Sequence, residues 1–265
     1  MAFTTFLRFL GEKKLGFFGC GHLGKAILDQ LLKAGFPKDK IIAAHKGSEK
    51  TRDFLKSNNI KTVSVPELLR DAKCILYLVR PQEIADTPQI VSKDSIVVSF
   101  LAGVSVPRLQ KLFGCNIIRL LPNSPDALRQ QRALCAIYPS PPAFLQEFID
   151  NFHFIKVPLQ REEEMHDFVG TVCSLPNVFT FLDGKVKDVD ILLFQSNVSF
   201  DYKPILTWAK NIYPHGLSSQ EKEVFLSRAA TKGGVNEAIL NALRSGKTVK
   251  EALQAGISRS KELGK

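Results

Sequence analysis

Continuous apolar runs of strand length recur through the first part of the chain and alternate with helical patterns. The runs are KLGFFG (14–19), KIIAAH (40–45), CILYLV (74–79), SIVVSFLAG (95–103), NIIRLLPN (116–123) and ALCAIYPS (133–140). Between the first two runs, apolar residues from Leu23 to Leu32 form a helical stripe that Gly35 ends. After the second run, SEKTRDFLKSNNI (48–60) is a charged helix. Apolar strands alternating with helices are typical of a parallel sheet covered on both faces. We predict an α/β fold, a Rossmann-type doubly wound parallel sheet, over residues 1–158.

The pattern changes after residue 158. From Arg161 onward helical periodicity dominates, and DILLFQSNVSF (190–200) is the one doubtful strand. Residues 235–243 carry apolar groups at i, i+3, i+4, i+7 and i+8, which indicates a helix. Thr248 and Glu251 fit a capping box at the start of another. We predict an all-helical second domain over residues 159–265.

Composition narrows the class of protein. Hydrophobic residues make up 45% of the 265 residues and charged ones 23%, which is ordinary for a soluble globular protein. No apolar run approaches the roughly 20 residues that cross a bilayer, and the start MAFTTFLRFLGEKK lacks the pattern of a signal peptide. Five dispersed cysteines favour a reducing compartment, so we expect a cytoplasmic protein without a membrane partner.

The net charge of +10 predicts attraction to anions. The lysines and arginines are scattered and form no basic run, which argues against nucleic acid as a partner. Phosphorylated cofactors and carboxylate substrates fit the charge equally well. The histidines are too dispersed for a metal cluster, so we expect no metal site.

The sequence GCGHLG provides the spacing Gly19-x-Gly21-x-x-Gly24 between the first predicted strand and its helix. In this context the first glycine allows a tight turn, the second lets a pyrophosphate approach, and the third permits close packing of helix on strand. We therefore predict that the first domain binds a dinucleotide.

The choice of dinucleotide is made about twenty residues later, where an acidic residue would bind the ribose 2′-hydroxyl of NAD. The chain instead has His45, Lys46 and Ser48, followed by Lys50 and Arg52. Cationic and hydroxyl groups suit a 2′-phosphate, so NADP(H) is the favoured cofactor, with NAD as the alternative. A solvated basic helix start would also explain Lys50 and Arg52.

Five segments, in order, resemble the pyrroline-5-carboxylate reductases. GFFGCGHLGKAI resembles that family's GFIGxGxMxxAI, LYLVRPQEI its xxAVKPxxx, and VVSFLAGVSV its hVSxxAGVxx. IIRLLPNSPDALRQQRA is similar to hhRxMPNTPxxhxxGx, and GGVNEAILNALRSGKTVKEALQAGISRSKELG to the family's closing motif. The resemblance runs from about Lys14 to the C-terminus and is poor near 183–227.

The resemblance implies an NAD(P)H-dependent oxidoreductase of proline biosynthesis that reduces the C=N bond of 1-pyrroline-5-carboxylate to L-proline. It implies a Rossmann domain followed by a helical substrate and dimerisation domain, in a homodimer or larger homo-oligomer. The cofactor positions that carry over are Gly19, Gly21, His22, Leu23, Gly24, His45, Lys46, Val79, Arg80, Pro81, Ala102, Gly103 and Asn123. The substrate positions are Thr231, Gly233, Gly234 and Asn236, with Asn236 and Ser174 as catalytic residues.

The chain departs from the family pattern around these substrate positions. The family's N-x-S-S-P-G-G-x-T appears as R-A-A-T-K-G-G-V-N, so that Arg228, Lys232 and Asn236 replace Asn, Pro and Thr. The segment 173–178 is also altered. Two alternatives therefore stay open: a reductase of another small imine or carbonyl acid, and a catalytically weak paralogue that binds NADP.

Overall fold

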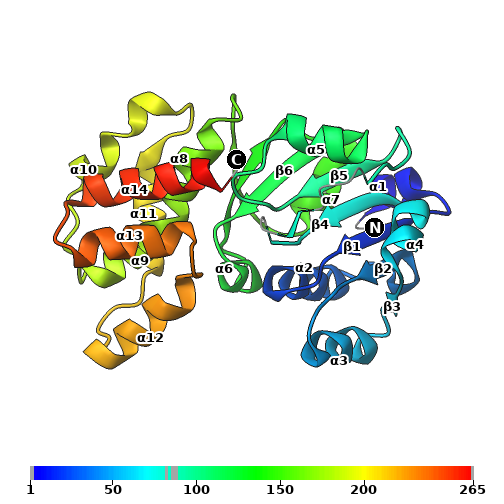
Figure 1. The fold of residues 1–265 in the computed structure, drawn as a ribbon, viewed down its shortest axis with the longest axis horizontal. Coiled ribbons are helices and arrows are strands. Elements are labelled where there is room, and N and C mark those ends of the chain that lie inside the picture. The colour runs from blue at the N-terminus through cyan, green and yellow to red at the C-terminus, as the bar shows by residue number, and fades with distance from the viewer. Residues whose placement is uncertain (1–2, 81–82, 85–88, 264–265) are drawn as a thin grey trace. The chain divides into compact units, whose positions relative to one another are not determined.

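The computed structural model describes residues 3–80, 83–84 and 89–263. The chain divides into two compact units, Met1–Pro158 and Leu159–Lys265, each described by itself below. Unit 1 is a sheet with helices, and unit 2 is a group of helices (Figure 1).

The sheet of unit 1 has eight strands in the order β3-β2-β1-β4-β5-β6-β7-β8. From β3 to β6 every neighbouring pair is parallel. The order 3-2-1-4-5-6 is that of the doubly wound dinucleotide-binding fold, so the predicted Rossmann-type sheet is confirmed. The strands are β1 Lys14–Phe18, β2 Ile41–Ala44, β3 Lys61–Thr62, β4 Ala72–Tyr77, β5 Ile96–Ser99, β6 Asn116–Pro122, β7 Leu134–Tyr138 and β8 Ile155–Pro158.

The last two strands depart from the predicted parallel direction. Strand β7 pairs antiparallel with β6, and β8 then runs parallel to β7. Only residues 123–133 connect β6 to β7, and they contain one short helix, α6 (Pro125–Arg129). A parallel crossover needs about a dozen residues or more and usually a full helix, so this short connection returns the chain in the opposite direction.

Successive residues of the central strands face opposite sides of the sheet and bury on both. Leu15, Leu76 and Val98 join the larger apolar cluster, whereas Ile75 and Val97 join the smaller one. Helices α2 (His22–Lys33), α6 and α7 (Ala143–Asp150) cover the first face, and α4 (Val65–Asp71) and α5 (Val106–Phe113) cover the second. The remaining helices of the unit are α1 (Thr4–Leu10), α3 (Glu49–Ser57) and the 3₁₀ turn η1 (Lys38–Lys40).

The chain begins with helix α1, which packs against α7 through aromatic side chains. The rings of Phe6 and Phe148 stack with centroids 4.2 Å apart, and those of Phe9 and Phe144 do the same at 4.2 Å. The N–H of Thr5 donates to Glu147 at 2.9 Å. The segment before the first strand is thus part of the core of unit 1.

Every regular element in the described part of unit 2, residues 159–263, is helical, as predicted. Helix α13 coincides with the predicted periodic segment, and Thr248 and Glu251 form the predicted capping box of α14. The elements are α8 Glu164–Gly170, η3 Val172–Ser174, α9 Leu175–Phe181, α10 Asp188–Leu192, η4 Gln195–Asn197, α11 Tyr202–Ile212, α12 Ser219–Ala229, α13 Val235–Arg244 and α14 Val249–Glu262.

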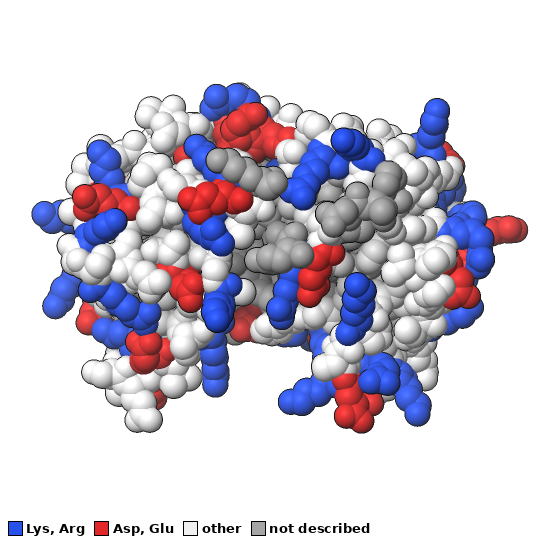
Figure 2. Space-filling model, in the orientation of Figure 1, with Lys and Arg blue, Asp and Glu red and all other residues white. Residues whose placement is uncertain are grey.

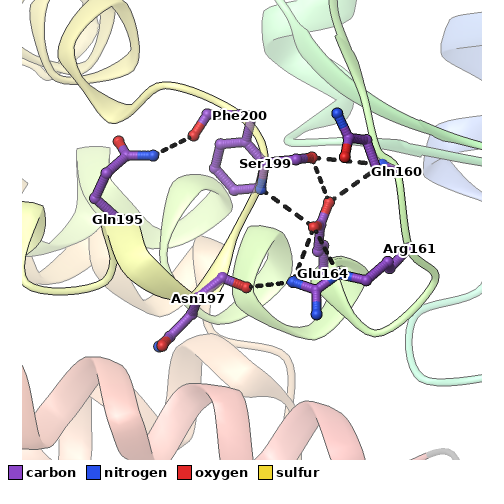
Figure 3. Close-up of polar contacts among 7 residues, drawn as sticks. All are labelled: Gln160, Arg161, Glu164, Gln195, Asn197, Ser199 and Phe200. Atoms are coloured by element: carbon purple, nitrogen blue, oxygen red, sulfur yellow. Dashed lines mark hydrogen bonds and ion pairs between the residues drawn. The ribbon is translucent and has the colours of Figure 1, made fainter.

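The doubtful strand over 190–200 is wrong. Its residues form the end of α10, the turn η4 and an irregular segment that is fixed by the carboxylate of Glu164 (Figure 3). Glu164 is 1% exposed and accepts hydrogen bonds from the hydroxyl and N–H of Ser199, the N–H of Gln160 and the guanidinium of Arg161. A buried charge is stabilised only where such donors surround it, so this cluster holds the 197–200 segment against α8.

Helices α8, α13 and α14 pack closely because glycine faces the contacts. A Cβ on Gly170 would lie 2.5 Å from the backbone nitrogen of Ile257, and one on Gly256 would lie 2.5 Å from the side chain of Ile239. Neither position accepts a larger residue without separating the helices. None of the helices formed by the described residues has the length and apolar character needed to span a membrane.

Candidate functional site

The turn between β1 and α2 has the geometry that its glycines predict. Gly19 has φ 96°, a left-handed conformation, and a Cβ there would lie 2.9 Å from the carbonyl carbon of Leu78. At Gly24 a Cβ would lie 3.3 Å from the carbonyl oxygen of Gly19, so helix and turn are in close contact. Gly21, by contrast, is the N-cap of α2, and a Cβ there would meet nothing within 4 Å. The space in front of Gly21 is where an anion can approach the N–H groups of the helix.

The first turn of α2 has a cationic neighbour, Arg129, which is paired with Asp126. The Nε2 atom of His22 lies 2.9 Å from Nη1 of Arg129, which also donates to Asp126 at 2.9 Å. His22 is exposed, Leu23 is half-buried, and the helix has no acidic residue in its first turn. A helix N-terminus without an acidic residue in its first turn favours a phosphate there.

The end of β2 carries His45 and Lys46. The N–H of Gly47 donates to Nδ1 of His45 at 3.0 Å, so a neutral ring carries its proton on Nε2. That Nε2 is buried and has no hydrogen-bond partner. Burial lowers the pKa of His45, and the charges of Arg52 and Lys25 lower it further. The ring is therefore neutral near pH 7 and offers one unused N–H donor.

The other predicted cofactor residues lie at the same edge of the sheet. Val79 and Arg80 follow β4, Ala102 and Gly103 follow β5, and Asn123 follows β6, so all lie beyond the carboxyl ends of parallel strands. In open α/β sheets this edge is where ligands bind. The side-chain Oδ1 of Asn123 is buried and has no hydrogen-bond partner. Pro81 lies outside the described residues.

Unit 2 holds the second set of predicted residues in the turn before α13. The N–H of Gly234 donates to the carbonyl of Thr231 at 2.8 Å, and Gly233 in the third position has φ 70°, as in a type II turn. A Cβ on Gly234 would lie 2.8 Å from that same carbonyl. Both glycines are therefore required by the turn itself.

Ser174 and Asn236 form one hydrogen-bonded pair. The hydroxyl of Ser174 donates to Oδ1 of Asn236 at 2.7 Å, and Nδ2 of Asn236 donates to the carbonyl of Ala229 at 3.1 Å. A carbonyl only accepts, so the orientation of the amide is fixed. Ser174 is 0% exposed and Asn236 is half-buried, so Asn236 is the member of the pair that faces outward.

Two residues that the sequence did not single out hold the same turn. The carboxylate of Glu237 accepts a hydrogen bond from the N–H of Gly233 at 2.7 Å, and Nε of Arg259 donates to the carbonyl of Gly233 at 2.8 Å. Glu237 stands in the first turn of α13, a position typical of capping glutamates, which is the signal that could have revealed it. Arg259 lies 26 residues beyond Gly233 in the chain, and no local sequence pattern indicates its contact. The replacements Arg228 and Lys232 are both exposed.

Comparison with known proteins assigns the family. Residues 14–103 match the family model described as NADP oxidoreductase, coenzyme F420-dependent. The pyrroline-5-carboxylate reductase of Escherichia coli is 30% identical over 194 residues, which cover 65% of this chain and 68% of that protein. The chain belongs to the pyrroline-5-carboxylate reductase family. The reductase of Haemophilus influenzae is 25% identical over 270 residues, 95% of this chain and 98% of that protein.

Solved structures of the family have the same fold. A pyrroline-5-carboxylate reductase from Coxiella burnetii aligns with TM-score 0.57 and 18% identity over 96% of this chain and 100% of that one. A pyrroline carboxylate reductase from Plasmodium falciparum, solved with NADP bound, aligns with TM-score 0.55 and 18% identity over 96% and 98%. The chain is thus an NAD(P)H-dependent oxidoreductase, a divergent member of its family.

Proposed function

We propose that this protein reduces 1-pyrroline-5-carboxylate to L-proline with NADPH. The observation that carries the proposal is the similarity to named pyrroline-5-carboxylate reductases over 95% of the chain. When bound, the cofactor supplies a hydride to the imine carbon; a proton goes to the nitrogen, and the C=N double bond becomes a single bond. The chain's own residues bind and orient the two reactants.

Unit 1 supports NADP(H) as the cofactor through the end of β2. None of the four residues directly after that strand (45–48) is acidic, and His45, Lys46 and Arg52 provide an N–H donor and two cations. The unsatisfied Nε2–H of His45 suits a phosphate oxygen, because a buried donor without an acceptor costs free energy. Gly21 at the N-terminus of α2 leaves room for the pyrophosphate.

In unit 2, we propose that Asn236 faces the ring of the imine. Its Oδ1 has a second lone pair and its Nδ2 a second hydrogen beyond the contacts to Ser174 and Ala229, so it can bind a substrate nitrogen without losing its position. Ser174, being fully buried, is a positioning residue that acts through Asn236. Thr231 is exposed and adds a hydroxyl beside the glycine pair.

The direct test is turnover by the purified protein. We expect NADPH oxidation to depend on pyrroline-5-carboxylate, with proline formed in equal amount and NADH used less efficiently. No proline at high enzyme concentration contradicts the proposed function. Tight NADPH binding with no turnover of any imine would instead support the catalytically weak paralogue.

A second candidate substrate is another small imine or carbonyl acid. It is favoured by the occupied glycine turn, where the N–H groups of Gly233 and Gly234 both have acceptors within the chain. A screen of cyclic imines separates the two candidates, because the physiological substrate should give the highest kcat/KM.

We also propose a cytoplasmic homodimer or larger homo-oligomer. In the described residues, none of the five cysteines forms a disulfide bond, as is usual in a reducing compartment. In unit 2 the side chains of Val189, Leu193 and Val224 are large, apolar and exposed, and a second copy would cover them. Light scattering over a hundredfold dilution tests this proposal; a monomer at every concentration contradicts it.

A further inference from the structure

The resemblance to pyrroline-5-carboxylate reductases implies that the N–H groups of the glycine pair bind the substrate carboxylate. In the turn before α13, both of these N–H groups already have acceptors within the chain. The N–H of Gly234 closes the turn on the carbonyl of Thr231, and the N–H of Gly233 donates to the carboxylate of Glu237 at 2.7 Å. The group that accepts from the N–H of Gly233 is itself a carboxylate. It has the same charge and the same acceptor atoms as the acid group of pyrroline-5-carboxylate.

Glu237 differs from the ordinary capping glutamates of this chain. Glu67, Glu221 and Glu251 each bind the N–H and the hydroxyl of a serine or threonine N-cap. The N-cap of α13 is Gly234, which has no hydroxyl and whose N–H is used by the turn. The carboxylate of Glu237 therefore reaches one residue farther back, to Gly233.

A second contact holds the Gly233 side of this pair in place. Arg259 fixes the turn from the opposite side by donating to the carbonyl of Gly233, and its second bond goes to Glu262. Lys232, the nearest cation in sequence, is exposed. Glu237 is half-buried, and its negative charge lies at the donor that a substrate acid group would use.

We propose that Glu237 determines which substrates the protein accepts. This proposal rests on the proposed function. The carboxylate of Glu237 occupies the position of the substrate's acid group, so that an imine bearing a carboxylate binds only by displacing it. An uncharged cyclic imine of the same size meets no such competition. Relative to imines that bear a carboxylate, neutral imines should therefore bind better here than in a site whose glycine N–H is free.

The kinetic test compares pyrroline-5-carboxylate with 1-pyrroline, the same ring without the acid group. In Glu237→Ala and Glu237→Gln we expect KM for pyrroline-5-carboxylate to fall about tenfold, the change expected for about 1.4 kcal/mol of removed repulsion. We expect KM for 1-pyrroline to stay within about twofold, since that imine carries no charge for Glu237 to repel. Glu221→Gln is the matched control, because it weakens a capping glutamate of α12 and should leave both KM values unchanged.

A binding test separates this inference from the proposed function. Cyclopentanecarboxylate and its neutral amide are titrated calorimetrically into the NADP⁺-loaded protein and its variants. Tighter binding of the acid, but not of the amide, to both Glu237 variants supports the proposal even if pyrroline-5-carboxylate is not turned over. Unchanged or weaker binding of the acid in variants that keep the wild-type melting temperature overturns it, whatever the turnover.

Discussion

The hydroxyl of Ser174 lies 2.7 Å from Oδ1 of Asn236 and donates its proton to it, although the two residues are 62 positions apart in the chain. Ser174 ends the turn η3, and Asn236 belongs to the first turn of α13. The pair joins the two altered segments of unit 2, so a change in one segment is transmitted to the other.

Ser174→Ala should lower kcat more than it raises KM. It removes one donor to Asn236, and displacement of a positioned group by about 1 Å reduces rates by up to about a hundredfold. We expect a loss of about tenfold, set below that limit because the bond of Asn236 to Ala229 remains. The decisive measurement is a double-mutant cycle: in an Asn236→Ala background the serine substitution should have no further effect on kcat. Additive losses would show that Ser174 does not act through Asn236.

Gly19→Ala and Gly21→Ala should separate folding from cofactor binding. Gly19 has φ 96° and no room for a Cβ, so its substitution should lower the free energy of unfolding by about 1–3 kcal/mol. Gly21 has φ −76° and open space around it, so Gly21→Ala should keep the wild-type melting temperature. Its KM for NADPH should nevertheless rise about tenfold or more, because the methyl group lies where the pyrophosphate approaches. Unchanged KM in Gly21→Ala would contradict the assigned cofactor position.

The double substitution Lys46→Ala with Arg52→Ala should raise KM for NADPH about tenfold and leave KM for NADH within about twofold. Only NADPH has a 2′-phosphate, and two exposed cations each contribute about 1 kcal/mol or less to binding it. Lys56→Ala is the control, because Lys56 lies on the last turn of α3, the helix that carries Arg52. It should change neither KM value. Equal changes for both cofactors would show that these cations do not read the 2′-phosphate.

Glu164 makes the stability of unit 2 depend on pH. Burial alone would raise the pKa of Glu164, but hydrogen bonds from Ser199, Arg161 and the N–H of Gln160 outweigh it and hold the pKa below its usual value of 4.5. The unfolded state therefore takes up the proton first. The contribution of Glu164 is complete above pH 4.5 and is lost as the pH falls through the lower native pKa.

The free energy of unfolding at pH 7 should accordingly be about 1–3 kcal/mol lower in Glu164→Gln than in the wild type. The difference from the wild type should shrink below pH 4.5, where the native carboxyl also takes up its proton. Urea titrations from pH 3 to 7 measure this difference in the free energy of unfolding. A difference that does not depend on pH would contradict the role given to the Glu164 carboxylate. Glu162→Gln, a neighbouring glutamate, is the comparison variant.

Charges of both signs are interspersed over the face shown in Figure 2, and lysines and arginines project around α3 at the lower right. The +10 net charge is thus not gathered into one patch on this face, in line with the scattered basic residues of the sequence. The local excess near α3 is the region where the 2′-phosphate is proposed to bind.

The sequence predicted the elements whose signal is local. The strands β1, β2, β4, β5, β6 and β7 are predominantly apolar runs, and the glycine turn at Gly19–Gly24 has its required spacing. Strand β3 escaped prediction because its two residues, Lys61 and Thr62, are polar and exposed. The 190–200 segment resembles a strand in sequence because it is rich in apolar residues. Those residues, such as Phe194 and Phe200, are buried without any strand pairing.

The unpredicted part of the candidate site depends on contacts that no local pattern contains. Arg259 reaches Gly233 across 26 residues, and Ser174 reaches Asn236 across 62. The occupied N–H of Gly233 is also invisible in the sequence, since a glycine pair before a helix looks the same whether its donors are free or used. Geometry, not composition, distinguishes the two cases.

The contact between α1 and α7 has a consequence for the newly made chain. Thr5 and its acceptor Glu147 are separated by 142 residues, as the ring of Phe6 is from that of Phe148. Ribosomes add roughly 5–20 residues per second, so the aromatic helix α1 waits about 7–30 s for the synthesis of its partner α7. During that interval its phenylalanines are exposed to other nascent chains and to chaperones. Helix α1 thus stays uncovered on this side until the much later helix α7 has been made.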